Sequence, residues 1–408
     1  MRSSPQRRER VLDTKTIRAE KALQALFGAS VEVTCLSAED KMGRRVTGLN
    51  LRQALTESQA KLLVSLLDEF SLLTFAAQNR VDFSVTDLER LANHFGAPIP
   101  HPKNYANYMA YQRQEASLML KSLSEQTATR CGNAFPEVIT CLEGADSPAV
   151  YLVNNLVDSG WAKKERVSSG LHWHTDIEFE RVPLSTSMFY VQTVPRTRDH
   201  AEQWVPNQLP EAGFYHPASS PELMARRLDL PLNGETAYAD SAAAFADLPR
   251  DQQLELLKVQ VRRRLKVGDK GWLIPLVYEN PRNGMLSLHS PVWASRGKNI
   301  APAQVEGLSS EASREFFDAL EQHVLDPKYR YDHVHQEGDV TVWSNFSTLH
   351  NAPPAKSLIN RPEDARLMYR ISCKGSPSYK LPRNDNSRWI HDNITPPYRT
   401  PEVTVAAG

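Results

Sequence analysis

The chain has 408 residues, of which 48 are basic and 48 are acidic, so its formal net charge is zero. This balance gives no electrostatic attraction toward nucleic acid or a membrane surface, and we predict neither as a partner. No apolar run approaches the roughly 20 residues of a transmembrane helix. The four cysteines are widely spaced and match no zinc or redox motif, which favours reduced thiols and a cytoplasmic location.

The amino-terminal part predicts short strands and capped helices after a basic segment. Residues 1–29 begin with an arginine-rich stretch and are expected to form a flexible tail. Short strands are predicted in three places, at 31–36, 45–51 and 72–75. Helices are predicted to begin after Thr56 and Ser84, because Gln59 and Asp87 follow them at capping-box spacing.

Two long segments in the middle of the chain show no clear hydrophobic periodicity. They span about 110–169 and 196–232, and we interpret them as insertions that form lids or partner surfaces. A strand is predicted between them at 184–194. Within the second insertion, residues 221–228 are predicted to be helical.

The carboxy-terminal half predicts two further helices and an extension. Residues 247–264 are predicted to form one amphipathic helix, with its final Arg-Arg-Arg on a solvated face near the helix end. A strand is predicted at 285–293, and a capped helix runs from Ser309 to about residue 324. His333 and His335 alternate on a predicted strand, and we interpret them as structural.

The chemistry is concentrated in residues 171–180, which read Leu-His-Trp-His-Thr-Asp-Ile-Glu-Phe-Glu. Alternate side chains of a strand share one face, so His172, His174 and Asp176 converge. Crowding titratable groups beside a tryptophan is unfavourable unless something satisfies them, and a divalent metal ion satisfies imidazole and carboxylate together. The segment therefore predicts part of a metal site, with either histidine as a ligand.

A third ligand is predicted at His350, where Gly-Asp-Val-Thr-Val-Trp-Ser-Asn-Phe-Ser-Thr-Leu-His ends. Arg366 and Arg370 follow on an alternating segment that places both guanidinium groups on one face. Two histidines and one carboxylate leave three metal positions open, as in Fe(II) oxygenases. A nearby arginine binds the far carboxylate of a dicarboxylic cosubstrate in bidentate fashion.

At these residues the chain resembles the Fe(II)/2-oxoglutarate dioxygenases of the taurine dioxygenase (TauD/TfdA) family. Trp-His-Thr-Asp at 173–176, Trp-x-Asn-x-x-Thr-x-His ending at His350, and Arg-x-x-x-Arg at 366–370 match in type, order and approximate spacing. The likeness also includes residues 46–51 and 94–101. It covers roughly residues 30–375.

The resemblance implies a role for each candidate residue. His174, Asp176 and His350 are expected to bind Fe(II), with His172 supporting the site. Arg366 is expected to bind the distal carboxylate of 2-oxoglutarate with help from the hydroxyl of Thr236, which follows a Gly-Glu pair. These roles are expectations carried over from the family.

The resemblance also suggests the kind of substrate. In sulfonate-oxidising relatives, a histidine near the position of His101 and an arginine matching Arg370 bind an anionic head group. Arg370 is therefore expected either to face the substrate or to assist Arg366. Tyr105 lies in the loop that follows His101 and is expected to help enclose the group. We predict a small, anionic organic substrate.

The implied reaction uses dioxygen to convert 2-oxoglutarate into succinate and carbon dioxide, coupled to hydroxylation or a related C–H oxidation. The expected fold is mainly β with flanking α-helices around a double-stranded β-helix, a jelly-roll or cupin-like core, in a single domain at 30–375. Residues 376–408 are expected to wrap over its surface. A homo-oligomer is compatible with these predictions.

Two other classes of protein fit part of the pattern. The same two histidines and carboxylate also suit a zinc-dependent hydrolase. That class gives no reason for Arg366 and Thr236, and the sequence has no His-Glu-x-x-His motif. The second of these classes is a non-catalytic jelly-roll binding or sensor protein, which would bind a ligand and release no succinate.

Overall fold

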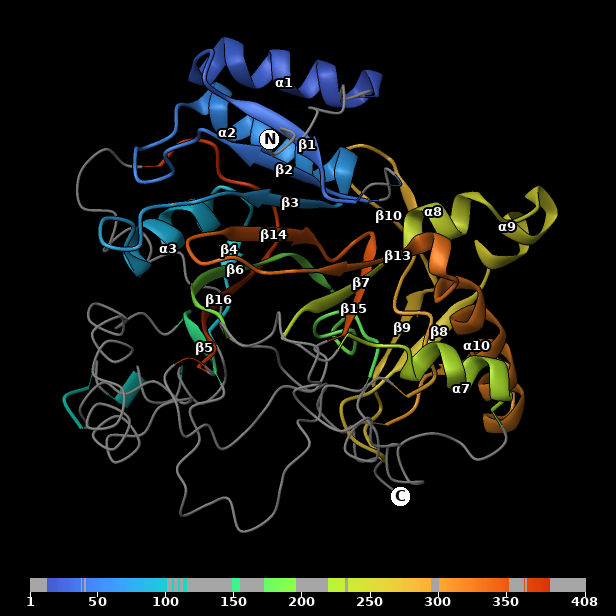
Figure 1. Cartoon of the computed structure of the whole chain (residues 1–408). Helices are drawn as coiled ribbons and strands as arrows, with labels where there is room; N and C mark the ends of the chain where they lie inside the picture. The colour runs from blue at the N-terminus through green and yellow to red at the C-terminus, as the bar shows by residue number, and fades with distance from the viewer. Residues whose placement is uncertain are drawn as a thin grey trace.

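A computed structural model describes residues 13–37, 39, 42–100, 105, 109–110, 113–115, 149–154, 172–195, 219–231, 234–294, 301–351, 363 and 365–381. Within these ranges a main sheet of eight strands crosses the molecule (Figure 1). Its strands, in spatial order, are β1 (Glu32–Cys35), β2 (Arg44–Thr47), β3 (Leu72–Phe75), β14 (Val340–Ser344), β6 (Leu184–Thr193), β16 (Leu367–Lys374) and β4 (Ala97–Pro98), and β5 (Tyr151–Asn154) also pairs with β16.

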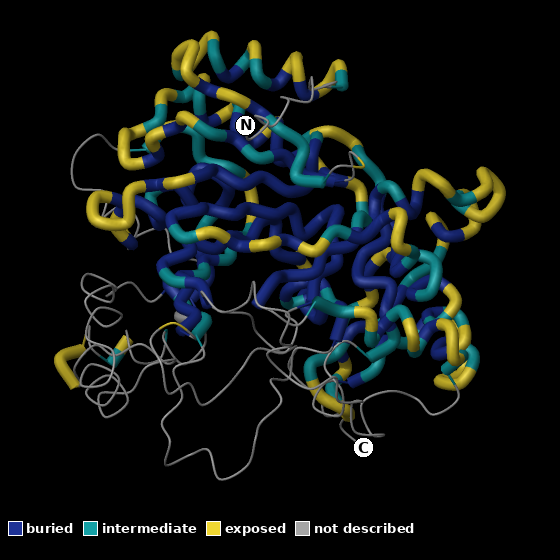
Figure 2. The backbone as a smooth tube through the Cα atoms, viewed as in Figure 1, coloured by how far each residue is buried: buried dark blue, intermediate teal, exposed yellow. Residues whose placement is uncertain are grey.

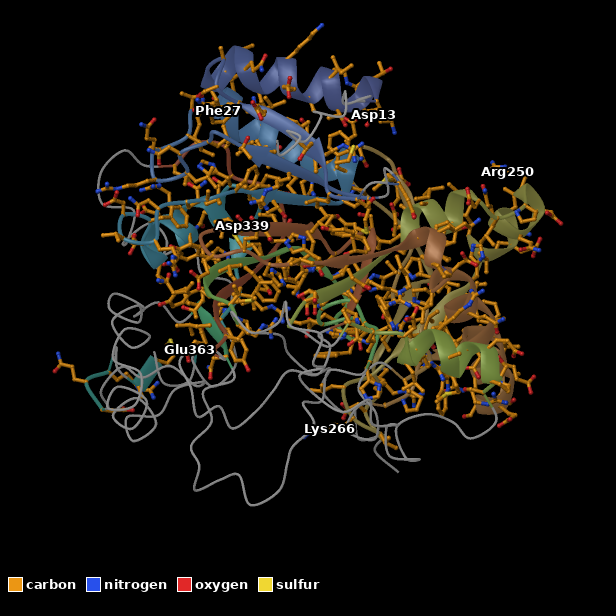
Figure 3. The ribbon with its side chains drawn as sticks, in the orientation of Figure 1. Asp13, Phe27, Arg250, Lys266, Asp339 and Glu363 are labelled. Carbon is orange, nitrogen blue, oxygen red and sulfur yellow. The ribbon has the colours of Figure 1, made fainter. Side chains whose placement is uncertain are left out.

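The pairing is antiparallel throughout this sheet, except that β2 and β3 run parallel. The strands predicted at 31–36, 45–51, 72–75 and 184–194 are confirmed, with ends shifted by a few residues. Asp339, labelled in Figure 3, immediately precedes β14, and both of its carboxylate oxygens accept hydrogen bonds from Arg45 of β2, at 2.7 and 3.0 Å. This ion pair fixes one end of β14 against the outer strands.

Helices α1 (Thr14–Phe27), α2 (Glu57–Phe70) and α3 (Val85–Asn93) lie against one face of the main sheet. Both predicted capping boxes are present, at Thr56 with Gln59 and at Ser84 with Asp87. Apolar side chains of the three helices share one buried cluster with odd-numbered residues of β16, such as Leu367. Burying each such side chain contributes about 1.5–3 kcal/mol.

The flexible tail predicted for residues 1–29 is wrong for residues 14–27. Asp13 accepts a hydrogen bond from the backbone N–H of Thr16 and begins helix α1, and it also pairs with the buried Arg44. Ala19 and Leu23 pack into the helical side of the core. Figure 3 labels Asp13 and Phe27 near the two ends of this helix. Residues 1–12 lie outside the described ranges.

A second, smaller sheet closes the other face of the main sheet. It contains β13 (Arg330–His333), β7 (Thr236–Asp240) and β15 (Thr348–Asn351), all antiparallel. Tyr238 of β7 packs against Phe189 of β6, Trp343 of β14 and Met368 of β16 in one buried cluster. Figure 2 shows the buried backbone concentrated where these strands lie. The two sheets therefore enclose an interior, which we call the inter-sheet cluster.

The remaining elements pack beside the smaller sheet. They are α7 (Pro221–Leu228), α8 (Ser241–Ala246), α9 (Arg250–Leu256), α10 (Ser310–Val324), a three-stranded sheet of β12 (Gln304–Val305), β8 (Gln260–Arg263) and β9 (Trp272–Pro275), and a hairpin of β10 (Val277–Glu279) and β11 (Leu286–Leu288). A third buried cluster joins α8 and α10 to β7 and β8. The helices predicted at 221–228 and from Ser309 are confirmed, and the strand predicted at 285–293 is confirmed only at residues 286–288.

The single helix predicted at 247–264 is wrong. Helix α9 ends at Leu256, and residues 260–263 form strand β8. Val261 is buried there, and so is Arg263, which donates a hydrogen bond to the carbonyl oxygen of His289 at 3.1 Å. The arginine triplet therefore lies on and after a strand, with one member inside the protein. Alternating burial along β8 outweighed the helical pattern of the preceding residues.

The helices of the described ranges include none that is both long enough and apolar enough to cross a membrane. Beyond β16, the first residues of the carboxy-terminal extension lie on the helical side of the fold. The carbonyl oxygen of Ser378 is 2.9 Å from Nδ1 of His94, and Lys380 pairs with Glu57 at 3.1 Å. Residues 382–408 lie outside the described ranges.

Candidate active site

Three side chains that are distant in the sequence meet at one end of the inter-sheet cluster. His174, Asp176 and His350 each offer one ligand atom, and these atoms lie within 4.8 Å of one another. Oδ1 of Asp176 is 3.8 Å from Nε2 of His174 and 3.4 Å from Nε2 of His350. Two imidazole nitrogens and a carboxylate oxygen thus face a common point. This is a donor set for a divalent transition metal ion.

Backbone pairing holds the two histidines together. The N–H of His174 donates to the carbonyl oxygen of His350 at 3.0 Å, and the reverse bond measures 2.9 Å. The rings are 4.3 Å apart between centroids. Thr175 adds a hydrogen bond from its hydroxyl to the carbonyl oxygen of Thr348, at 3.2 Å. The segment around His174 is therefore attached to β15 by an isolated antiparallel bridge.

The ring of His174 is oriented by its own backbone. Nδ1 of His174 lies 3.0 Å from the carbonyl oxygen of His172. A carbonyl only accepts, so Nδ1 carries the proton and Nε2 presents a lone pair toward Asp176. His172 supports the site through its backbone, and its buried ring is outside the metal-ligand group found in the described ranges.

Asp176 is held as a carboxylate by its surroundings. It follows the short β-bridge and precedes Ile177, whose φ of +54° is a left-handed conformation that is strained for a β-branched residue. Its Oδ2 accepts a hydrogen bond from Ser187 of β6 at 2.7 Å and pairs with Nη2 of Arg370. Burial alone would raise the pKa of Asp176, but Arg370 and the two histidines hold it well below its usual value.

Ser187 itself is held by Asn345, which follows β14, and by Ser372 of β16. Its hydroxyl oxygen accepts a hydrogen bond from Nδ2 of Asn345 at 3.0 Å and lies 3.0 Å from the hydroxyl of Ser372. Oδ2 of Asp176 is therefore fixed by β6 and β16, which leaves Oδ1 directed at the two histidines. The sequence prediction missed Ser187, because only the antiparallel register of β6 brings it to Asp176.

Arg366 and Arg370 are on one face of the β16 segment, as the alternation predicted. Arg366 is buried, and its charge acts on the hydroxyl of Tyr238. Arg370 is about a quarter exposed, and its guanidinium carbon lies 5.9 Å from the ring centroid of Phe189 and 5.8 Å from that of Trp343. The two arginines thus line the inter-sheet cluster at different depths.

Thr236 lies at the start of β7, two residues before Tyr238 and therefore on the same face of the strand. Its Oγ1 is 2.8 Å from Nε2 of His335, a fully buried histidine that follows β13. Tyr238 is the cross-strand neighbour of His350. His335 and Tyr238 are contacts of the predicted site that the sequence prediction did not include.

The predicted substrate residues remain predictions. His101 lies outside the described ranges. Tyr105 is described and half-buried, and its role in substrate binding is untested by the structure.

A family model described as "Taurine catabolism dioxygenase TauD, TfdA family" matches residues 34–372. Pentalenolactone F synthase of Streptomyces arenae is 23% identical over 249 residues, which are 54% of this chain and 68% of that protein. The alpha-ketoglutarate-dependent 2,4-dichlorophenoxyacetate dioxygenase of Burkholderia sp. (strain RASC) is 27% identical over 159 residues, which are 35% of this chain and 52% of that protein.

Among solved structures, AAD-2 in complex with Mn(II) and N-oxalylglycine has a TM-score of 0.51 and 16% sequence identity, covering 86% of this chain and all of that one (100%). At this identity the likeness shows a shared fold. The family match spans most of the chain and includes every residue of the metal-ligand group, so an oxidoreductase explains the site and a hydrolase or a non-catalytic binding protein does not. The chain therefore belongs to the TauD, TfdA family and is a 2-oxoglutarate-dependent dioxygenase.

Proposed function

We propose that His174, Asp176 and His350 bind a single Fe(II) ion and that the protein uses 2-oxoglutarate and dioxygen to oxidise a C–H bond of a small anionic substrate. The observation that carries this proposal is the convergence of three lone-pair donors on one point, where Asp176 and His350 are buried and His174 is partly exposed. Two imidazole nitrogens and a carboxylate oxygen suit Fe(II), and three protein ligands would leave room on the ion for the cosubstrate and dioxygen. The metal supplies the redox chemistry that couples the loss of carbon dioxide from 2-oxoglutarate to oxidation of the substrate.

The protein's own part in the reaction is to fix the ligands. Ser187 and Arg370 occupy Oδ2 of Asp176, so that Oδ1 is presented to the metal. The carbonyl oxygen of His172 keeps Nε2 of His174 unprotonated. These contacts orient Oδ1 of Asp176 and Nε2 of His174 toward the point where an ion would bind.

The cosubstrate is proposed to lie in the inter-sheet cluster beside the metal. Arg366 would pair with its distal carboxylate, and the hydroxyl of Thr236 would donate a further hydrogen bond. Thr236 begins β7 on the same face as Tyr238, Arg366 precedes β16 on the same face as Arg370, and the charge of the buried Arg366 guanidinium suits a carboxylate. N-oxalylglycine, which the related AAD-2 structure contains, shares the carbon framework of 2-oxoglutarate with an NH in place of one CH2.

The main sheet and the smaller sheet are proposed to form the two halves of a double-stranded β-helix. The inter-sheet cluster would be its interior, and the metal group would lie at its open end. The antiparallel pairing of β14, β6 and β16 in the main sheet and of all strands in the smaller sheet supports this proposal.

An anionic substrate is proposed from the charge of Arg370. Asp176 uses one nitrogen of this guanidinium, and a guanidinium has five N–H donors. Its partial exposure lets the remaining donors meet a carboxylate, sulfonate or sulfate ester beside Phe189 and Trp343. We propose a cytoplasmic location, where 2-oxoglutarate and reduced iron are available.

The proposal is tested by measuring oxygen uptake and succinate release with Fe(II), 2-oxoglutarate and a panel of small anions: sulfonates, sulfate esters, amino acids and aryloxyacids. We expect at least one anion to raise succinate release above the uncoupled background. Asp176→Ala should abolish release, whereas Asp332→Ala, which removes a carboxylate of β13 outside the metal-ligand group, should retain it. Zinc in the purified protein together with no oxygen uptake would contradict the proposal.

A further inference from the structure

The hydroxyl of Tyr238 is fully buried and has no hydrogen-bond partner among the described residues. A buried hydroxyl without a partner loses its hydrogen bonds to water and gains nothing in return. The ring already fills its space, contacting Trp343 at 5.7 Å and His350 at 6.4 Å between centroids. A phenylalanine would make the same contacts, so packing does not explain the hydroxyl.

The position of Tyr238 relates it to the proposed cosubstrate site. It is two residues from Thr236 on the same face of β7, and it is paired across the strands with His350. Its ring packs with Phe189, Trp343 and Met368 in the inter-sheet cluster. The charges of Arg370, Asp176 and Arg366 all act on its hydroxyl.

The hydroxyl of Tyr238 can donate one hydrogen bond. A carboxylate accepts hydrogen bonds from a phenol and from a guanidinium together. By contrast, the hydroxyl of Thr236 is already shared with His335.

We infer that the hydroxyl of Tyr238 donates a hydrogen bond to the distal carboxylate of 2-oxoglutarate, as a third donor beside Arg366 and Thr236. The inference rests on the proposed function, because it needs the cosubstrate to occupy the inter-sheet cluster. It makes Tyr238 a residue that sets cosubstrate affinity and leaves the metal ligands unchanged.

The test is a calorimetric titration of the full-length protein, loaded with Mn(II), with N-oxalylglycine and separately with oxalate. Oxalate chelates a metal ion but has no distal carboxylate. The variant is Tyr238→Phe, which removes only the hydroxyl. The matched control is Tyr329→Phe, which removes a tyrosine hydroxyl that donates to Asp247, away from the metal group.

We expect Tyr238→Phe to weaken N-oxalylglycine binding by about 10- to 100-fold, the range for a hydrogen bond to a charged group. Binding of Mn(II) and of oxalate should match the wild type, as should all three affinities of Tyr329→Phe. The melting temperature of unliganded Tyr238→Phe should not fall, because no protein contact is lost. Equal N-oxalylglycine affinity in both proteins, equal weakening of oxalate, or a lower unliganded melting temperature would each overturn the inference. Failure of the wild type to bind N-oxalylglycine would instead contradict the proposed function.

Discussion

Ser187 donates a hydrogen bond to Oδ2 of Asp176 at 2.7 Å, and this contact joins two elements that the chain order separates. Asp176 lies on the turn after the β-bridge, and Ser187 lies in the middle of β6. The contact turns the other carboxylate oxygen toward both histidines. The strand that builds the core of the sheet therefore also sets the geometry of the metal-ligand group.

Removing this contact should weaken metal binding. Ser187→Ala leaves a buried carboxylate oxygen with one partner fewer, and we expect metal affinity to fall by about 10- to 100-fold. The measurement is a titration of Mn(II) into the purified variant. Ser313→Ala is the control, because it also removes a buried, hydrogen-bonded hydroxyl, one that lies in α10. If both variants bind Mn(II) as the wild type does, Ser187 has no part in positioning Asp176.

The hydroxyl of Thr236 should matter for the cosubstrate more than for the metal. Thr236→Val keeps the shape of the side chain and removes the hydroxyl, so we expect the KM for 2-oxoglutarate to rise about tenfold with little change in kcat. Thr236→Ser should restore the affinity, since it returns the hydroxyl. Steady-state kinetics with varied 2-oxoglutarate test this. A fall in kcat alone, at constant KM, would not fit the proposed contact.

The prediction from sequence succeeded where a local pattern carries the information. Both capping boxes, the spacing of His174 and Asp176, and the shared face of Arg366 and Arg370 are local properties of short segments. The distant His350 was found because a strand pattern ends in a histidine before the two arginines. These predictions need no knowledge of how strands pair.

The prediction from sequence failed where strand pairing or tertiary packing determines the structure. Ser187 and Tyr238 are ordinary strand residues in the sequence, and only the register of β6 and β7 brings them to the site. The helical pattern at 247–264 continued past Leu256, but pairing of β8 with β9 and β12 favours a strand there. The helix at 14–27 was missed because its apolar face is narrow, with only Thr16, Ala19 and Leu23 buried.

The stability of the protein should fall in mild acid because of His289. Burial lowers the pKa of His289 to about 3 from an ordinary value of 6.5, and the charge of Arg263 adds to this. Between these values the unfolded chain binds a proton that the folded protein excludes, so stability is lost as the pH falls below about 6.5. The slope from this group is at most about 1.4 kcal/mol per pH unit.

The measurement is urea unfolding at several values between about pH 5 and 6, comparing the wild type with His289→Leu. The free energy of unfolding should depend less steeply on pH in the variant, because leucine cannot bind the proton that His289 binds in the unfolded chain. For each protein, the free energy of unfolding at each pH is compared with that protein's own value at neutral pH. Equal slopes for the two proteins would show that His289 is protonated alike in the folded and unfolded states.

The helical layer should contribute strongly to stability through α2. Leu67 is fully buried in the cluster between this helix and the main sheet, and Leu67→Ala should lower the free energy of unfolding by about 2–5 kcal/mol. Leu254→Ala, on the exposed face of α9, should change it by less than about 0.5 kcal/mol. Chemical denaturation followed by circular dichroism measures both values. Comparable losses for the two variants would contradict the assigned packing.

The central claim is tested most directly by anaerobic calorimetric titration of Fe(II) into the wild-type protein and into Asp176→Ala. We predict one bound ion in the wild type and at least a 100-fold weaker interaction in the variant, consistent with the loss of about 3 kcal/mol or more when a charged ligand is removed. Equal uptake of Fe(II) by the two proteins would show that His174, Asp176 and His350 do not form the metal site.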